Sequence, residues 1–299
     1  MRPSPGAWLH ELSHRIPAHA VLILPAIIAI VTFLVLPVGY LLLLSFNPPT
    51  TGEIHLNGQF TLLNYSRLLS DPFYLLIVLR SVLVAAATSI IAAVAGYPLA
   101  LSLWRAPAAY RSYLVVMVLA PLLISVVVRT YGWMVILGDK GVLNTALISL
   151  QIISQPLEIM FTRTAVVIGL VHVLLPFMAL SVLSSLERID PAVPEAARTL
   201  GAGPLAVHRH VIAPLAVPGF AAGVTIVFSF AISAYVTPML MGRGATDMIT
   251  ILIYQQFMSV FNWHFGSALT TVLLAVTLMV LSVALYLFSL RTHAWLARK

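Results

Sequence analysis

The sequence has no cysteine and very few charged residues. Without cysteine the chain can form no disulfide framework, thiol chemistry or thiolate metal site. Charged residues make up 8% of its 299 residues, whereas soluble proteins carry about 25%. A soluble domain of this length could not cover its surface with so few charges. The composition therefore predicts an integral membrane protein.

Hydrophobic residues make up 61% of the chain and gather in long runs. Each run matches or exceeds the roughly 17–25 residues that a helix needs to cross a bilayer core. None contains Asp, Glu, Lys or Arg. We therefore expect an all-α polytopic membrane protein with six transmembrane helices, at Ala20–Phe46, Ser81–Trp104, Ser112–Val128, Thr164–Leu186, Leu215–Gly242 and Phe265–Leu290.

The net charge of +7 does not indicate nucleic-acid binding, because the basic residues stand singly beside the apolar runs, as they do at a lipid bilayer. Six spans place both termini on one side. With the termini inside, ten Lys and Arg residues lie inside and six outside, which favours cytoplasmic termini. We expect a single integral membrane domain at 20–290, between cytoplasmic tails at 1–19 and 291–299.

Several shorter features lie outside the spans or on their faces. Apolar periodicity predicts a short surface helix at Leu62–Leu69, an amphipathic helix at 142–153 and a re-entrant or interfacial helix at Ile249–Trp263. Gly219 and Gly223, four residues apart, allow close helix approach. The spacing leaves open whether they pack inside this chain or against a partner subunit.

The loop between the fourth and fifth runs (residues 187–214) is longer than a simple connection needs. Asp190 is a suitable N-cap, and Pro191 fits the first helical position. Gly201 can end that helix in a left-handed conformation. Gly203-Pro204 starts a second helix, expected to end before Pro214. These signals predict two short helices, which suit either partner docking or an ordinary amphipathic loop.

The same loop carries a recognisable spacing. It resembles the coupling motif of binding-protein-dependent ABC importer permeases. That motif reads Glu-Ala-Ala, three residues, Gly, nine residues, an aliphatic residue, one residue and Pro. The family usually has Leu where this chain has Ala213, next to the apolar Ile212. The matching positions, which the resemblance identifies as the ATPase-coupling loop, are Glu195, Ala196, Ala197, Gly201, Val211 and Pro214.

The resemblance extends along most of the chain. It is similar to the spermidine/putrescine branch of that family, and specifically to the first of its two permease subunits. This implies a type I ABC importer permease fold in the bacterial cytoplasmic (inner) membrane, and a polyamine or another small solute. The segments that carry it are residues 60–65, 96–100, 129–133, 141–144 and 187–191.

The resemblance also implies partners. They are two copies of a cytoplasmic ATP-binding subunit, a second permease subunit in a heterodimer and an extracytoplasmic solute-binding protein. Neither lysine of this chain, Lys140 or Lys299, stands in a Gly-x-x-x-x-Gly-Lys-Ser/Thr sequence. ATP and magnesium are therefore expected on the partner, and we expect no catalytic residue, metal or cofactor in this chain.

Polar residues within or beside the spans are candidates for a solute path. Tyr131 and Trp133 fit an interfacial aromatic belt equally well. A single histidine in a span is more often hydrogen-bonded to a neighbouring helix. No carboxylate lies in a predicted span, so we expect selectivity to reside mainly in the external binding protein. The candidates are Tyr131, Trp133, His172, Ser229, Ser233, Tyr235 and Thr237.

Other functions fit the sequence less well. An ion-coupled secondary transporter usually places carboxylates or ion sites near the membrane midplane, and the predicted spans hold no acid. A membrane enzyme could pair His172 with Ser181, but no spacing supports it. A stand-alone channel would leave the 187–214 loop without a role.

Overall fold

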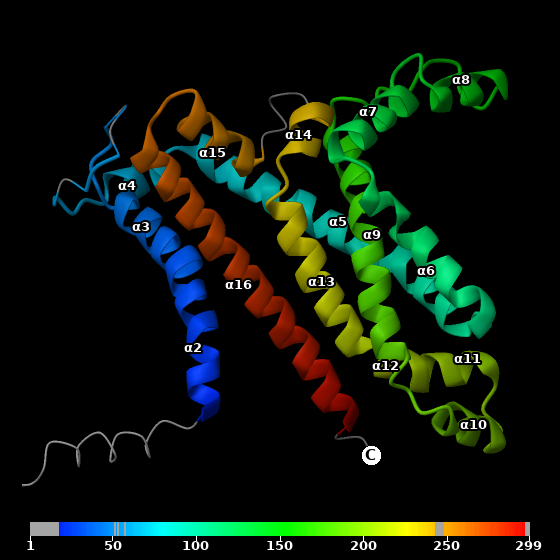
Figure 1. Ribbon diagram of the computed structural model, residues 1–299. Coiled ribbons are helices and arrows are strands. Elements are labelled where there is room, and N and C mark those ends of the chain that lie inside the picture. The colour runs from blue at the N-terminus through cyan, green and yellow to red at the C-terminus, as the bar shows by residue number, and fades with distance from the viewer. Residues whose placement is uncertain (1–17, 51, 53, 57, 243–247, 297–299) are drawn as a thin grey trace, which may run out of the picture.

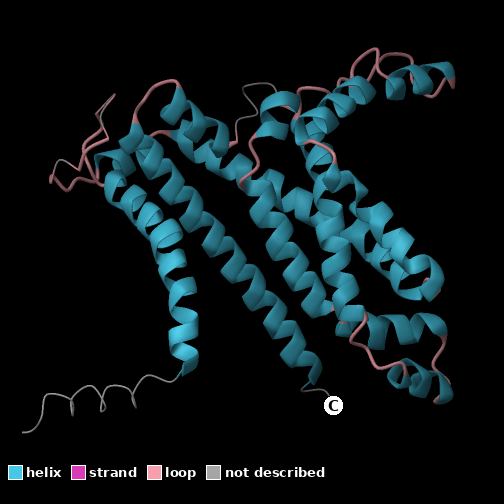
Figure 2. Cartoon of the chain, viewed as in Figure 1, coloured by secondary structure: helices cyan, strands magenta, loops and turns pink. Residues whose placement is uncertain are grey.

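The computed structural model describes residues 18–50, 52, 54–56, 58–242 and 248–296. Within these ranges the chain folds into helices and connecting loops with no named strand, and Phe161 and Gly242 form an isolated bridge (Figure 2). Residues 1–17 of the expected tail at 1–19 and residues 297–299 of the expected tail at 291–299 lie outside the described part. The fold is thus helical, as the composition predicts.

Among the described residues, four helices are long and apolar enough to cross a membrane alone, and two bent pairs raise the number to as many as six. The crossing elements run between two ends of the molecule (Figure 1). Their bounds are α2 Ala18–Ile30, η1 Val31–Val35, α3 Leu36–Ser45, α5 Pro72–Arg105, α6 Ala108–Leu123, α9 Arg163–Leu186, α13 Val217–Ile232 and α16 Trp263–Leu296.

Short helices join the crossing elements at both ends. At one end lie α4, α8, α14 and α15; at the other lie α10 and α11, together with the first described residue of α2 and the last of α16 (Figure 1). Their bounds are α4 Leu63–Ser70, α7 Val126–Leu137, α8 Val142–Ser149, α10 Ala192–Thr199, α11 Pro204–Val207, η2 His208–Ile212, α12 Ala213–Leu215, α14 Val236–Met241 and α15 Ile249–Met258.

The third predicted span is not one helix. α6 ends at Leu123, and the chain bends by 91° before α7 and α8 continue. The guanidinium of Arg129 donates a hydrogen bond to the backbone carbonyl of Pro121. A break frees backbone groups that must find partners in a membrane, and Arg129 supplies one. Pro121 inside this apolar run favours a bend, but the sequence does not indicate its size.

The fifth predicted span is also interrupted. α13 ends at Ile232, and residues 233–235 precede the separate helix α14. The carbonyl of Ala234, inside the break, accepts a hydrogen bond from the Thr250 hydroxyl at 2.7 Å. The predicted run Leu215–Gly242 therefore divides into the crossing helix α13 and the short helix α14, which lies at one end of the bundle.

Three short helices occur where apolar periodicity predicts them. α4 at 63–70 lies on the predicted segment at 62–69, α15 occupies 249–258 of the predicted 249–263, and α8 occupies 142–149 of the predicted 142–153. α16 continues to Leu296, past the expected end of the last span at Leu290.

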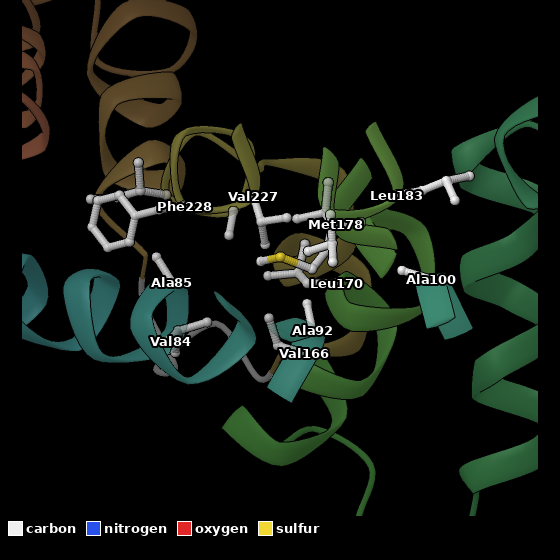
Figure 3. Close-up of a cluster of buried hydrophobic side chains, with 14 of the residues drawn as sticks. Val84, Ala85, Ala92, Ala100, Val166, Leu170, Met178, Leu183, Val227 and Phe228 are labelled. Atoms are coloured by element: carbon white, nitrogen blue, oxygen red, sulfur yellow. The ribbon is translucent and has the colours of Figure 1, made fainter. Parts of the chain in front are cut away.

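The core is formed by α5, α9 and α13, whose side chains interdigitate in Figure 3. Ala92, Met178 and Val227 contribute one buried side chain from each helix. Lipid tails are as apolar as these side chains, so close packing rather than the hydrophobic effect stabilises such contacts. A three-helix centre of this kind fixes where both ends of each helix lie.

The glycine pair of α13 packs inside the chain. A Cβ built at Gly219 would lie 2.7 Å from the Ser181 carbonyl oxygen, and one at Gly223 would lie 2.5 Å from the Met178 sulfur. Both neighbours belong to α9. Of the two possibilities left open by the spacing, internal packing is the one that the structure shows.

Large apolar side chains also cover the outer surface. Phe33, Val94 and Met117 are 82%, 71% and 73% exposed. Such a surface suits contact with lipid tails, because exposing so much apolar area to water is energetically unfavourable.

Candidate functional site

The 187–214 loop begins with a capped helix. The Asp190 carboxylate accepts a hydrogen bond from the backbone N–H of Ala192 at 2.9 Å, as expected of an N-cap. The helix α10 ends at Thr199, and Gly201, two residues further on, has a φ of +87°, in the left-handed region. Glycine adopts this conformation without steric cost. Asp190 and Gly201 thus delimit the first helix as predicted.

The second helical part differs from the prediction. α11 begins at Pro204, but the backbone remains helical through the wide turn η2 and through Pro214 to Leu215. A proline is tolerated at the start of a helical segment, where its missing N–H is not needed. The expected end before Pro214 is therefore wrong, and α11, η2 and α12 form one bent arm that leads into α13, bent from it by 55°.

The tip of the loop is exposed. Glu195 and Ala196 are exposed, and Ala197 is half-buried. Leu200 and Leu205 are 88% and 77% exposed. Because α10 and α11 project from the end of the bundle (Figure 1), this carboxylate and these two leucines form an accessible surface of mixed character.

The base of the loop is anchored in the core. Val207, Ile212 and Ala216 are 1%, 3% and 0% exposed and belong to the same buried cluster as Leu186 and Ile189. Of the residues matched by the motif, Val211 and Pro214 are half-buried beside these anchors. The tip is thus free to meet another surface while the base is fixed.

Two side-chain contacts tie the loop to other helices. Arg111, at the start of α6, forms an ion pair with Glu187. Tyr97 on α5 lies with its hydroxyl oxygen 3.0 Å from Nε2 of His208 in η2. Neither contact was anticipated from the sequence, because each joins residues more than 70 positions apart.

A cavity of about 290 Å³ lies between α9, α13 and the start of α14. Phe177 and Phe230 line it with ring centroids 5.2 Å apart. Tyr235 also lines it and stacks on Tyr254, with centroids 4.6 Å apart. Of the described residues on its wall, none is charged; they are Val126, Leu170, Val173, Leu174, Phe177, Phe230, Ala234, Tyr235, Val236 and Thr237.

The candidate path residues do not form one site. Tyr235 and Thr237 line the cavity. Trp133 and His172 contact each other instead, with Nε1–H of the indole donating to Nδ1 of the imidazole at 3.1 Å. Interhelical hydrogen bonding, the more common role of such a histidine, is therefore what the structure shows.

The remaining candidates lie apart from that cavity. Tyr131 is 53% exposed on α7. The hydroxyls of Ser229 and Ser233 donate to the carbonyls of Thr225 and Ser229 in their own helix, each at 2.7 Å. The sequence reasoning missed Phe177 and Phe230, because an aromatic residue in an apolar run looks like any other lipid-facing or core residue.

Comparisons with known proteins cover most of the chain. Residues 94–294 match the family described as "Binding-protein-dependent transport system inner membrane component". The chain is 39% identical over 224 residues to the spermidine/putrescine transport system permease protein PotB of Escherichia coli (strain K12), covering 75% of this chain and 81% of that protein. It is 38% identical to the PotB of Haemophilus influenzae, covering 74% and 78%.

Solved structures resemble the fold. A chain in the crystal structure of a bacterial ABC transporter involved in the import of the acidic polysaccharide alginate superposes with a TM-score of 0.73 at 17% identity, covering 90% of this chain and 94% of the other. The complex of the bacterial alginate transporter with its alginate pentasaccharide-bound periplasmic protein gives a TM-score of 0.74 at 18% identity, covering 91% and 94%. These likenesses show a shared fold.

Proposed function

Because the chain belongs to the family of binding-protein-dependent transport system inner membrane components, we propose that it forms half of the translocation path of an importer. It is an ABC importer permease of the bacterial inner membrane, and permeases of this family are not themselves enzymes. A separate ATPase drives it through the 187–214 loop.

The observation that carries this proposal is the form of the loop. Glu195 and Leu200 are exposed on a capped helix at the tip, while Val207 and Ile212 are buried at the base. An exposed tip suits a groove on another protein, and Glu195 can pair with an Arg or Lys there. Because the base of the loop is packed in the core, a displacement of the Glu195 tip is transmitted to the helices of the core. Glu195, Ala196, Ala197, Gly201, Val211 and Pro214 are the residues we assign to this coupling.

The proposed topology has six spans with both termini in the cytoplasm. It counts α6 with its bent continuation and the bent pair of Pro204–Leu215 with α13 as one span each. The described ends of α2 and α16 lie at the same end of the bundle as α10 and α11 (Figure 1). A loop that meets a cytoplasmic ATPase therefore puts both described ends on the cytoplasmic side.

The proposed assembly contains a second permease subunit, two ATP-binding subunits and an extracytoplasmic solute-binding protein. ATP and magnesium bind to the ATPase subunits, and this chain holds no cofactor of its own. One structural neighbour was solved together with a periplasmic protein, which supports a similar arrangement here.

The proposed solute is a polyamine of the spermidine or putrescine type. Relatives at 39% and 38% identity are spermidine/putrescine permeases. The cavity wall offers the rings of Phe177, Phe230 and Tyr235, and aromatic faces attract ammonium groups. Another small solute of the same branch is the alternative, because the described wall has no carboxylate to select a cation.

Reconstitution tests the proposal. The chain is co-produced with the ATPase, second permease and solute-binding protein of the proposed assembly, and uptake of radiolabelled spermidine and putrescine into proteoliposomes is measured with and without internal ATP. We expect ATP-dependent uptake that disappears in Glu195→Ala. Uptake that needs no ATPase subunit would contradict the mechanism. Competition by an uncharged solute but not by spermidine would contradict the polyamine assignment alone.

A further inference from the structure

Tyr97 and His208 join a crossing helix to the 187–214 loop. The Tyr97 hydroxyl oxygen lies 3.0 Å from Nε2 of His208, although the residues are 111 positions apart. Their rings also touch, with centroids 5.5 Å apart. Both side chains are half-buried, so water competes only in part for the hydrogen bond. The contact is therefore a directional link between α5 and η2.

Tyr97 sits where several helices meet. Its ring packs on Phe220 of α13 with centroids 5.1 Å apart. The preceding residue, Gly96, lies so close to α9 that an added Cβ would be 2.8 Å from Cγ of Met178. One turn of α5 thus contacts the loop, α13 and α9 together. A displacement that reaches Tyr97 reaches all the helices of the core.

The other attachments of the loop have different properties. Val207 and Ile212 are buried among apolar side chains, and apolar contacts have no preferred direction. The Arg111–Glu187 ion pair has side chains 31% and 47% exposed, and exposed pairs contribute little. Tyr97–His208 is a hydrogen bond at a partly buried position, so it adds a directional constraint on η2 relative to α5 to the apolar packing of Val207 and Ile212.

We propose that Tyr97 and His208 are positioning residues that make α5 and η2 move as one unit when a partner ATPase displaces the loop. This inference rests on the proposed function. Without the hydrogen bond the apolar anchors remain, so the ATPase still docks and still hydrolyses ATP. The loop then shifts relative to α5 during part of the cycles, and less solute crosses for each ATP consumed.

The first test separates coupling from folding. Tyr97→Phe keeps the ring that packs on Phe220 and removes only the hydroxyl. His208→Leu removes the ring nitrogens, and His208→Gln restores a polar group at a similar reach. The readout is the number of solute molecules imported per ATP hydrolysed in proteoliposomes that hold the complete transporter.

We expect Tyr97→Phe and His208→Leu each to lower this ratio by about 2- to 10-fold, the range set by the net value of one hydrogen bond. The double variant should fall no further than either single variant, and His208→Gln should recover most of the ratio. A proportional fall of uptake and hydrolysis, with the ratio unchanged, would mean a merely structural role and would overturn the proposal, as would an unchanged ratio in Tyr97→Phe.

The second test needs no solute. Because the chain contains no cysteine, Ser102→Cys on α5 and Arg209→Cys in η2 introduce the only two thiols of this chain for spin labels, and cysteine-free partner subunits are used. Both positions are exposed. In the ATPase-bound complex we expect the same narrow distance distribution with and without ATP, and a broader one in Tyr97→Phe. A distance that changes with ATP in the parent complex would overturn the proposal.

The two tests separate the proposed function of the chain from the role of Tyr97. If the parent complex binds its ATPase but imports no polyamine, the solute assignment fails while the distance measurement still decides the role of Tyr97. If no ATPase binds the chain, the proposed function and this inference are both overturned.

Discussion

The indole N–H of Trp133 on α7 donates a hydrogen bond to Nδ1 of His172 on α9. The two rings meet edge to face, with centroids 5.4 Å apart. Since Nδ1 is the acceptor, a neutral His172 carries its proton on Nε2. This contact fastens α7 to α9 on the far side of the bend that ends α6.

Trp133→Phe should destabilise the protein by about 1–2 kcal/mol, because it leaves Nδ1 of His172 without its donor. The thermal unfolding midpoint in detergent measures the effect. Trp104→Phe is the matched control, since Trp104 packs against the core and the same ring area is lost. An equal fall in both variants would show that the hydrogen bond makes no separate contribution.

Gly201 should accept Asn but not Val. Its φ of +87° is strained for other residues, and an added Cβ would meet nothing within 4 Å, so the cost comes from the backbone alone. Asn visits the left-handed region readily, whereas a β-branched residue is a clear outlier there. We expect Gly201→Val to cost about 1–2 kcal/mol locally and to reduce co-purification of the ATPase subunit. Co-purification as strong as in Gly201→Asn would contradict this.

Gly219→Ala should destabilise the bundle more than Gly223→Ala. The new Cβ at 219 would meet the backbone carbonyl of Ser181 at 2.7 Å, which cannot move alone. The Cβ at 223 would meet the flexible thioether of Met178 at 2.5 Å. Overpacking costs about 1–3 kcal/mol, and we expect Gly219→Ala near the upper end. Gly39→Ala, with nothing within 4 Å, is the control in the same thermal assay.

Asn144 should hold α8 in place. It is fully buried; its amide N–H groups donate to the carbonyls of Gly138 and Leu157, both at 3.0 Å, and its oxygen accepts from the Leu157 N–H at 2.8 Å. Asn144→Ala leaves these groups unpaired, at about 1–3 kcal/mol. Exposed Lys140 and Arg163 flank the segment, so trypsin should cut there several-fold faster.

Asn144→Asp keeps the acceptor for the Leu157 N–H but turns a carboxyl oxygen toward the two carbonyls in a buried position, so its cleavage rate should be at least that of Asn144→Ala. Equal cleavage of all three proteins would show that α8 is held by other contacts.

Phe177 and Phe230 should matter more for a cationic solute than a lipid-facing phenylalanine does. Cation–π contacts contribute about 0.5–2 kcal/mol, so Phe177→Leu and Phe230→Leu should each raise the KM for spermidine uptake by about 2- to 30-fold. Phe33→Leu, at a residue 82% exposed, is the control. A KM that is the same in all three variants would remove these rings from the path.

Much of the fold follows from simple patterns. Apolar runs long enough to span a bilayer predict the helices, and Asp190 and Gly201 predict the bounds of α10, because caps act through the backbone of the next few residues. Pro121 favours a bend in the third run, but the size of that bend and the contact of Arg129 with the Pro121 carbonyl could not be predicted. A local pattern contains no information on which helix a distant side chain will meet.

The same limit applies to the candidate site. The Glu195 tip is visible in the sequence because its residues are consecutive. The Tyr97–His208 link and the Phe177–Phe230 pair are not, because each joins different helices. His172 was placed correctly as a hydrogen-bonded residue, yet its partner on α7 could be named only from the packed structure.

The unequal lengths of the crossing helices make this permease sensitive to the thickness of its bilayer. α6 has 16 residues, about 24 Å of helix, whereas α5 has 34 residues, about 51 Å at 1.5 Å per residue. A hydrocarbon core of about 30 Å is thicker than α6 is long, so α6 needs its bent continuation or thinner lipid to complete a crossing, while α5 can tilt or extend beyond the core. Longer acyl chains would therefore strain the molecule first at the bend between α6 and α7.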